Sequence, residues 1–180
     1  ILIIDLKDII SGSHQAEGRL EAKALMFNSE SGIEFSGPLF LSVRISTTDQ
    51  LTYYTKGWIS FEMDEKCSRC LKALHHHQRT RISGIFAFPE ALDRLELSGE
   101  RLEEEGIREL EQGRKTIDLT DLVRECVLLD YPRFLQCSED CKGLCPVCGC
   151  NLNERECNCA RDEIDPRWAK LKELQDKGDN

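Results

Sequence analysis

Eight of the ten cysteines in this chain occur in close pairs, and this spacing constrains the fold more than any other feature. In chain order the four pairs are Cys67 and Cys70, Cys137 and Cys141, Cys145 and Cys148, and Cys157 and Cys159. Ten cysteines in 180 residues fall below the roughly 8–10% typical of a small disulfide scaffold. Residues 1–10 show no secretory signal, so we expect a cytoplasmic, reducing compartment, where such pairs usually bind metal.

The segment 145–149, Cys-Pro-Val-Cys-Gly, is the strongest metal-binding signal. Two thiolates separated by two residues can bind one ion if the backbone turns tightly between them, and Gly149 relieves crowding after the second thiolate. The fourth pair can close a tetrahedral four-thiolate shell. Such a closed shell is structural, and its soft thiolates favour zinc. The third and fourth pairs therefore predict one zinc site.

The first and second pairs predict another zinc site, which would join distant parts of the chain. Structural zinc contributes on the order of 10 kcal/mol to folding. An alternative partition combines the second pair with the third and the first pair with the fourth. The sequence leaves both partitions open, and each requires two zinc ions.

Other chemistries also use paired cysteines. A redox pair usually needs a low-pKa thiol at a helix N-terminus, and neither pair with two-residue spacing precedes a clear helix. An iron–sulfur cluster also takes four cysteines, but the Cys-Pro-x-Cys-Gly turn fits zinc better. We place Cys126 and Cys150 outside the sites, with Cys126 as a buried core thiol. The three histidines at 75–77 are expected to be exposed polar residues or weak RNA contacts.

Hydrophobic periodicity predicts a strand-rich first part over residues 1–65. Alternation is clear at 39–45 and 58–63 and weak at 19–25. A further strand at 80–88 follows the first cysteine pair. We therefore expect a hairpin with that pair at its tip.

The second half of the chain differs in character. Residues 90–113 hold nine acids and three arginines, which favours a solvated, partly helical excursion. Residues 118–130 form the best predicted helix, which Asp118 or Thr120 can cap and Pro132 ends. A short terminal helix is predicted at 165–175.

Together these features predict an α+β fold with an antiparallel, β-rich core over residues 1–135. Residues 136–180 would form a Cys-rich, metal-binding segment that packs on this core. No apolar run reaches the length of a membrane span. The order of residues shows no catalytic triad, phosphate loop or dinucleotide-binding glycines, so we expect no enzymatic activity and no small-molecule substrate.

A net charge of -9 argues against nucleic-acid binding by the whole surface. Residues 66–89, however, contain no acid and carry five cations: Lys66, Arg69, Lys72, Arg79 and Arg81. These cations either offset the anionic thiolate centres or form a salt-sensitive RNA contact surface. The sequence leaves both interpretations open.

Residues 67–71, Cys-Ser-Arg-Cys-Leu, resemble the C-x-R-C motif of the YceD family, the large ribosomal RNA subunit accumulation proteins. Further similar segments are 117–125, 137–149, 151–153, 157–159 and 165–168. The resemblance implies a role in 23S rRNA accumulation and large-subunit assembly, with ribosomal RNA or a pre-ribosomal particle as partner. It implies no established enzymatic activity. Some members lack the Cys-Pro-x-Cys-Gly part, which supports uniting the first and second pairs.

Three functional hypotheses follow. The first is a non-enzymatic, zinc-binding factor for ribosome biogenesis. The second is a protein-binding adaptor that docks a partner through residues 90–113 and the terminal helix. The third, which we rank last, is a thiol redox protein.

Overall fold

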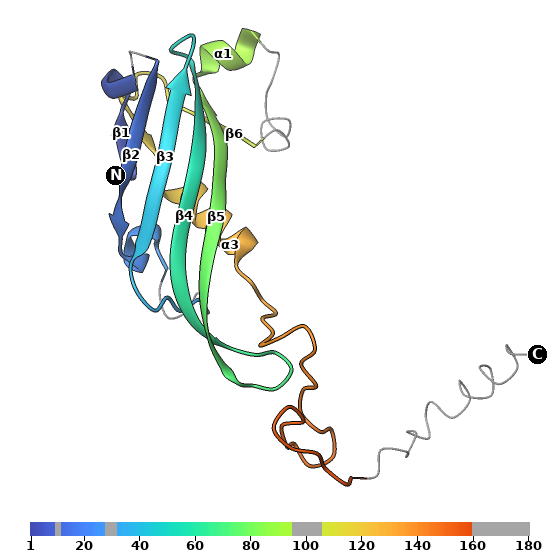
Figure 1. The fold of residues 1–180 in the computed structure, drawn as a ribbon. Coiled ribbons are helices and arrows are strands. Elements are labelled where there is room, and N and C mark those ends of the chain that lie inside the picture. Colours follow the sequence, from blue (N-terminus) through green and yellow to red (C-terminus); the bar gives the residue numbers. More distant parts are fainter. Residues whose placement is uncertain (10–11, 28–31, 95–105, 160–180) are drawn as a thin grey trace, which may run out of the picture. The chain divides into compact units, whose positions relative to one another are not determined.

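The structure is a computed structural model that describes residues 1–9, 12–27, 32–94 and 106–159. It divides into two compact units (Figure 1). Unit 1 contains residues Ile1–Glu65 and Ala73–Arg133, and unit 2 contains Lys66–Lys72 and the chain from Phe134 onward. The first cysteine pair thus groups with the Cys-rich segment. Whether residues 1–135 and 136–180 act as separate domains stays a prediction.

Unit 1 is built around a five-stranded sheet of order β2-β3-β4-β5-β6. Its strands are β2 (Ser13–Leu20), β3 (Leu39–Thr47), β4 (Thr52–Lys66), β5 (Ala73–Ala87) and β6 (Ile107–Glu109). The β2–β3 and β3–β4 pairs are antiparallel, whereas β6 lies parallel to β5. A separate two-stranded sheet pairs β1 (Ile3–Asp5) with β7 (Thr116–Asp118).

The helices are few and short. They are the α-helices α1 (Pro89–Arg94) and α3 (Thr120–Asp130) and the 3-10 helices η1 (Leu6–Ile9) and η2 (Ala22–Leu25). The predicted α+β class with a strand-rich first part is confirmed. The predicted helix at 165–175 lies outside the described residues. None of the helices described is long and apolar enough to cross a membrane.

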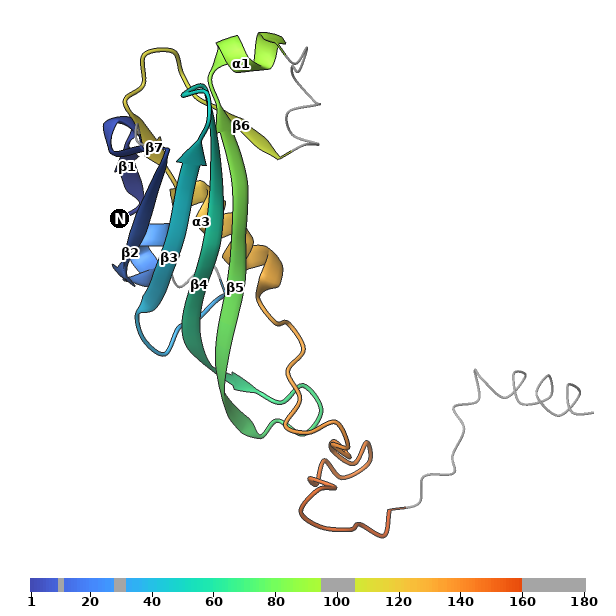
Figure 2. The ribbon, with the colours of Figure 1, turned by 45° about the horizontal axis from the view of Figure 1, so that its top comes forward.

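One face of the five-stranded sheet carries the core. Ile59, Phe61 and Met63 alternate on β4 and are at most 1% exposed, as their spacing predicts. Helix α3 covers this face, as Figure 2 shows. A Cβ atom at Gly84 of β5 would lie 2.7 Å from the side chain of Leu122, so the absent side chain permits close packing of helix on strand.

The weak strand predicted at 19–25 is wrong beyond Leu20. Strand β2 ends there, and η2 follows, closed by Met26 in the left-handed conformation with φ 57°. This short helix places Leu25 at 0% exposure and is followed by Phe27 at 5%. Burial of these two large side chains outweighs a weak alternation that includes two small alanines.

Part of the acidic segment 90–113 is ordered and joins the fold. Residues at its start form α1, whose Ala91 and Leu92 are buried against Ala87. After 95–105, which lie outside the described residues, β6 adds to the sheet edge and Leu110 is 3% exposed. Helix α1 agrees with the partly helical interpretation of this segment, whereas the expectation that it is solvated is wrong for these buried ends. Strand pairing uses backbone groups, so an acidic composition does not prevent it.

Helix α3 confirms the helix predicted at 118–130 over Thr120–Asp130, but its N-cap is Leu119 without a side-chain capping hydrogen bond, so the predicted cap at Asp118 or Thr120 is wrong. The Asp118 carboxylate accepts a hydrogen bond from the Thr120 backbone N–H at 2.9 Å. Tyr131 is extended, as expected for a residue before proline. Cys126 is half-buried rather than a full core residue, and burial raises the pKa of its thiol.

Candidate metal centres

The first centre begins with a tight turn in unit 2. The Cys67 backbone N–H donates to the Lys72 carbonyl at 2.8 Å, and the Leu71 N–H donates back to the Cys67 carbonyl at 2.9 Å. Leu71 adopts a positive φ of 60°, which closes the turn. The side chains of Cys67 and Cys70 are both buried. The expected Cys-tipped hairpin is thus present, because this turn joins β4 to β5.

Four sulfur atoms meet at this turn. The Sγ atoms of Cys67 and Cys141 are 3.8 Å apart, and those of Cys70 and Cys137 are 3.6 Å apart. All four lie within 4.8 Å of one another. A tetrahedral zinc ion with Zn–S bonds of about 2.3 Å places its sulfur ligands about 3.8 Å apart. The donor set therefore fits one tetrahedral ion, and none of the four cysteines forms a disulfide.

The surroundings of the sulfurs favour thiolate at two positions. Backbone N–H groups, that of Cys70 foremost, lower the pKa of Cys67 to about 6. Burial raises the pKa of Cys141, but hydrogen bonds from the Gly143 N–H and the Asn153 amide outweigh it, so the net shift is downward.

Cys70 shows why a cation is needed here. The Lys72 N–H lowers its pKa, but burial and the neighbouring thiols raise it more strongly, to about 12. Four thiolates cannot crowd together without a compensating positive charge. A divalent ion would supply that charge and hold every sulfur deprotonated.

The second centre contains Cys145, Cys148, Cys157 and Cys159, whose Sγ atoms also lie within 4.8 Å of one another. The chain before and after its knuckle is held by an antiparallel bridge between Leu144 and Asn151. Within the knuckle, the Gly149 N–H donates to the Cys145 carbonyl at 2.9 Å, and Gly149 has a φ of 70°. This positive φ explains the glycine after the second ligand.

Cys150 lies beside the second centre but outside its group of four. Its carbonyl accepts the Cys145 N–H at 2.8 Å, and its own N–H is the main group that lowers the pKa of Cys148. A hydrogen bond with Cys148 raises the pKa of the Cys150 thiol to about 11. Cys150 thus supports the knuckle through its backbone.

The grouping follows the first of the two partitions that the spacing allows. Both groups lie in unit 2, where residues 141–145 run from one to the other. Gly143 has a φ of 75°, and a Cβ atom there would lie 3.2 Å from the Arg69 carbonyl. The Leu144 N–H donates to that same carbonyl at 3.1 Å. This glycine allows the second segment to approach the first turn.

Asn153 is a supporting residue that spacing arguments did not single out. Its side-chain amide donates to Cys141 Sγ at 3.4 Å, and its side-chain oxygen accepts the Lys142 N–H at 2.8 Å. Asn151 orients it by accepting its backbone and side-chain N–H groups at 3.0 and 2.8 Å. The Asn-Leu-Asn segment between the third and fourth pairs was the available signal.

The five cations predicted as an RNA contact are all exposed. Lys66, Arg69 and Lys72 belong to unit 2, whereas Arg79 and Arg81 belong to unit 1. None of them forms an ion pair with an acid in the described parts of the chain. Whether they contact RNA stays a prediction.

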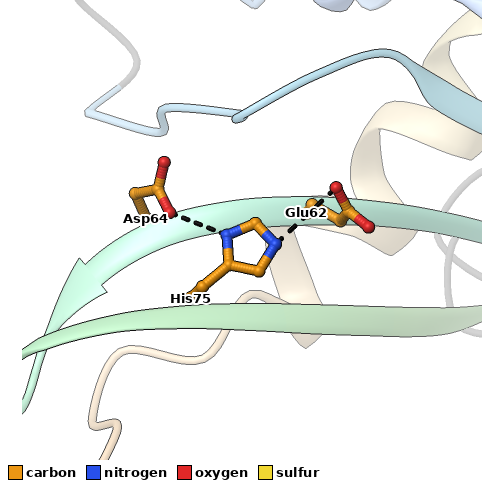
Figure 3. A network of polar contacts seen from close by, with 3 residues as sticks. All are labelled: Glu62, Asp64 and His75. Atoms are coloured by element: carbon orange, nitrogen blue, oxygen red, sulfur yellow. Dashed lines mark hydrogen bonds and ion pairs between the residues drawn. The ribbon is translucent and has the colours of Figure 1, made fainter.

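His75 is paired with carboxylates and not with thiolates. Its Nδ1 lies 2.7 Å from Asp64, and its Nε2 lies 3.7 Å from Glu62 (Figure 3). The hydrogen bond with Asp64 raises the pKa of this exposed imidazole. Among the described residues, the groups able to hold a metal contain cysteine alone.

The family model for "Large ribosomal RNA subunit accumulation protein YceD" matches residues 55–175. An uncharacterized protein of Mycobacterium leprae is 30% identical over 142 residues, which cover 79% of this chain and 61% of that protein. An uncharacterized protein of Mycobacterium tuberculosis is 32% identical over 139 residues, covering 76% of this chain and 61% of the relative. The chain thus spans less than two thirds of the length of these relatives.

A further relative is the chloroplastic "Large ribosomal RNA subunit accumulation protein YCED homolog 1" of Arabidopsis thaliana. It is 38% identical over 63 residues, which cover 35% of this chain and 20% of that protein. No solved structure matches the chain. The family match covers more than half of the sequence and includes all four cysteine pairs. The chain belongs to the YceD family, which is named for accumulation of the large ribosomal RNA subunit.

Proposed function

We propose that the protein is a non-enzymatic, zinc-containing factor that supports 23S rRNA accumulation and assembly of the large ribosomal subunit. Membership of the YceD family supports this proposal, because the family is named for large ribosomal RNA subunit accumulation. Its partner would be ribosomal RNA or a pre-ribosomal particle in the cytoplasm. The two four-cysteine groups and the unpaired cations of residues 66–81 supply the physical means.

The eight paired cysteines would hold two structural zinc ions. The sulfur separations of 3.6 and 3.8 Å at the first centre support tetrahedral thiolate coordination. Four protein ligands per ion leave no position for water or substrate, which favours a structural over a catalytic role. A thiol redox role is less favoured, because a tight turn, rather than a helix N-terminus, surrounds each pair with two-residue spacing.

Metal content and thiol titration test the zinc part of the proposal. We expect two zinc ions per chain and at most two reactive thiols, Cys126 and Cys150, in the native protein. Cys67→Ser and Cys157→Ser should each remove one ion, because the two residues belong to different groups. Loss of both ions from either variant, or more than two reactive thiols in the purified native protein, would contradict two separate zinc sites.

RNA binding is tested by replacing the five cations of residues 66–81 with glutamine in the zinc-loaded protein. Affinity for 23S rRNA fragments should fall, and the slope of log K against log salt should flatten by up to about 0.7 per lost phosphate contact. The control carries Lys23→Gln and Lys115→Gln, two exposed lysines elsewhere in unit 1. Unchanged affinity and slope would refute RNA contact by these cations. A protein partner retained after nuclease treatment would then favour the adaptor.

A further inference from the structure

The five-stranded sheet of unit 1 has a second face, opposite the one that α3 covers. Among the described residues of unit 1, no helix or strand lies over this second face (Figures 1 and 2). We call it the outer sheet face. Alternate residues of β2 to β5 form it. Its basic and aromatic members are Arg19, Phe40, Arg44, Tyr54, Lys56, Trp58, Arg79 and Arg81.

The strand register brings these side chains into neighbouring rows. Arg19 of β2 lies opposite Phe40 of β3, and Arg44 of β3 lies opposite Lys56 of β4. Trp58 follows two positions after Lys56 on the same face of β4. On β2, β3 and β4, each of these aromatic residues therefore lies directly opposite a cation or two positions from one along its strand.

The outer sheet face carries positive charge that its own acids do not neutralise. None of its five cations forms an ion pair with any acid among the residues described. Glu17 instead accepts hydrogen bonds from Gln15 at 3.0 Å and Ser42 at 2.8 Å. The acids near the other end of β4 flank His75.

Two cation placements point to an external anion. Arg44 and Lys56 are directly opposite each other, and like charges in this position destabilise a strand pair. Lys56 and Arg81 also line one pocket together with Ser83. An anion held between these cations would relieve both unfavourable arrangements.

The aromatic residues provide flat surfaces beside this charge. Phe40 is 49% exposed and Tyr54 is 41% exposed. The Arg79 guanidinium lies 4.3 Å from the centre of the Trp58 ring, and the Arg19 guanidinium lies 5.6 Å from that of Phe40. Nucleic-acid bases stack on aromatic rings and on guanidinium planes alike.

We propose that the outer sheet face binds a single-stranded stretch of RNA. The cations would contact phosphates, and Phe40 together with the Trp58–Arg79 stack would contact bases. A single strand is required because paired bases hide the ring faces that stack on a protein. The unneutralised charge favours a polyanion over a protein partner. This inference rests on the proposed function. It adds to that function the form of RNA that is bound and a binding surface that includes strands β2, β3 and β4.

Stacking is tested on the full zinc-loaded chain with Trp168→Phe, which leaves Trp58 as the one tryptophan of the two in the sequence. A mixed-sequence single-stranded RNA 12-mer should quench Trp58 fluorescence. Trp58→Ala should weaken binding of a labelled 12-mer roughly 5- to 150-fold, which is the effect of losing one stacked base. Trp58→Phe should retain most of the affinity, and it keeps the test valid if Trp58→Ala fails to fold.

Charge and stacking can be separated by two further variants. Arg79→Lys keeps the positive charge but removes the planar group, so affinity should fall while the salt slope stays unchanged. The double variant Arg44→Gln with Lys56→Gln should flatten the salt slope by about 1.4, or 0.7 per phosphate contact. Lys23→Gln with Lys115→Gln removes two exposed charges elsewhere and should leave both quantities unchanged.

The outcomes distinguish this inference from the proposed function. Binding of 23S rRNA fragments that no outer-face variant alters would overturn the inference and leave the proposed function standing. Failure of the chain to bind any RNA would overturn the RNA contact in both. Equal competition by duplex and single-stranded RNA would overturn the single-strand assignment. If the chain does not bind RNA but binds an acidic peptide, and the same variants weaken that binding, the face would be assigned to a protein partner and the inference would be overturned.

Discussion

The two units of this protein are stabilised by different means. In unit 1, large apolar side chains such as Phe61, Ile82 and Val123 are at most 1% exposed between sheet and helix. In unit 2, every buried hydrophobic side chain among the described residues is a cysteine. Apolar burial supplies folding free energy without a cofactor, whereas clustered thiols become favourable once a cation is present. The comparison indicates that unit 1 can stay folded without metal and that unit 2 cannot.

Metal removal should separate the two units most clearly. A chelator strong enough to remove zinc should abolish amide protection in residues 66–72 and 134–159, while the amides of β3 and of residues 52–65 in β4 keep theirs. The lost free energy is on the order of 10 kcal/mol or more for a structural zinc site. Hydrogen exchange of the zinc-loaded and chelated protein provides the measurement. Protection that persists in unit 2 without metal would break the comparison.

A core substitution should act on unit 1 alone. Phe61→Ala removes a side chain that is 1% exposed, and a cavity of this kind costs about 3–5 kcal/mol. The free energy of unfolding of unit 1 should fall by this amount in denaturant titrations, with zinc content unchanged. Phe40→Ala, on an outer ring that is 49% exposed, should cost far less. Loss of zinc from Phe61→Ala would show that the two units are coupled.

Substitution of a supporting residue should weaken the metal affinity of one centre without abolishing metal binding. Asn153→Ala deletes the amide that donates to Cys141 Sγ at 3.4 Å. Loss of such a partner typically weakens metal affinity about 10- to 100-fold. Competition with a chromophoric chelator should show one weakened ion and one unchanged ion. Asn158→Ala, an exposed asparagine nearby in sequence, serves as the control and should leave both ions unchanged.

The smallest expected effect concerns His75. Its pKa is raised because the imidazolium is stabilised by its hydrogen bond with Asp64. The contribution to stability is therefore fully present below the pKa of an unfolded histidine and is lost as pH rises through the folded value. An NMR titration of His75 should show the raised pKa, and Asp64→Asn should lower it toward 6.5, the ordinary value. A titration unaffected by this substitution would exclude the pairing.

The sequence predicted the elements whose periodicity is strong. The alternation of Ile59, Phe61 and Met63 specified the buried face of β4, and the stripe on residues 118–130 specified α3. The α+β class follows from these two patterns. The edge strand β6 was missed because its pairing with β5 depends on backbone groups, which an acidic composition does not reveal.

The candidate site followed from spacing more than from periodicity. Paired cysteines identified the eight clustered thiols, but spacing alone left two partitions open, because either gives four ligands per ion. The sulfur positions separate them: the Sγ atoms of Cys67 and Cys141 lie 3.8 Å apart and those of Cys70 and Cys137 lie 3.6 Å apart, across segments distant in sequence. The role of Asn153 likewise depends on a fold that no local pattern encodes.

The ligand positions also have a consequence for the order in which the centres form. Cys67 and Cys141 are 74 residues apart, so the first centre closes a long loop that includes β5 and α3. The second centre lies wholly between Cys145 and Cys159. For flexible loops, a fivefold difference in length costs about 1.4 kcal/mol of additional chain entropy. During synthesis on the ribosome, the second centre can thus assemble from one short segment. The first centre can form only after β5 and α3 have been synthesised.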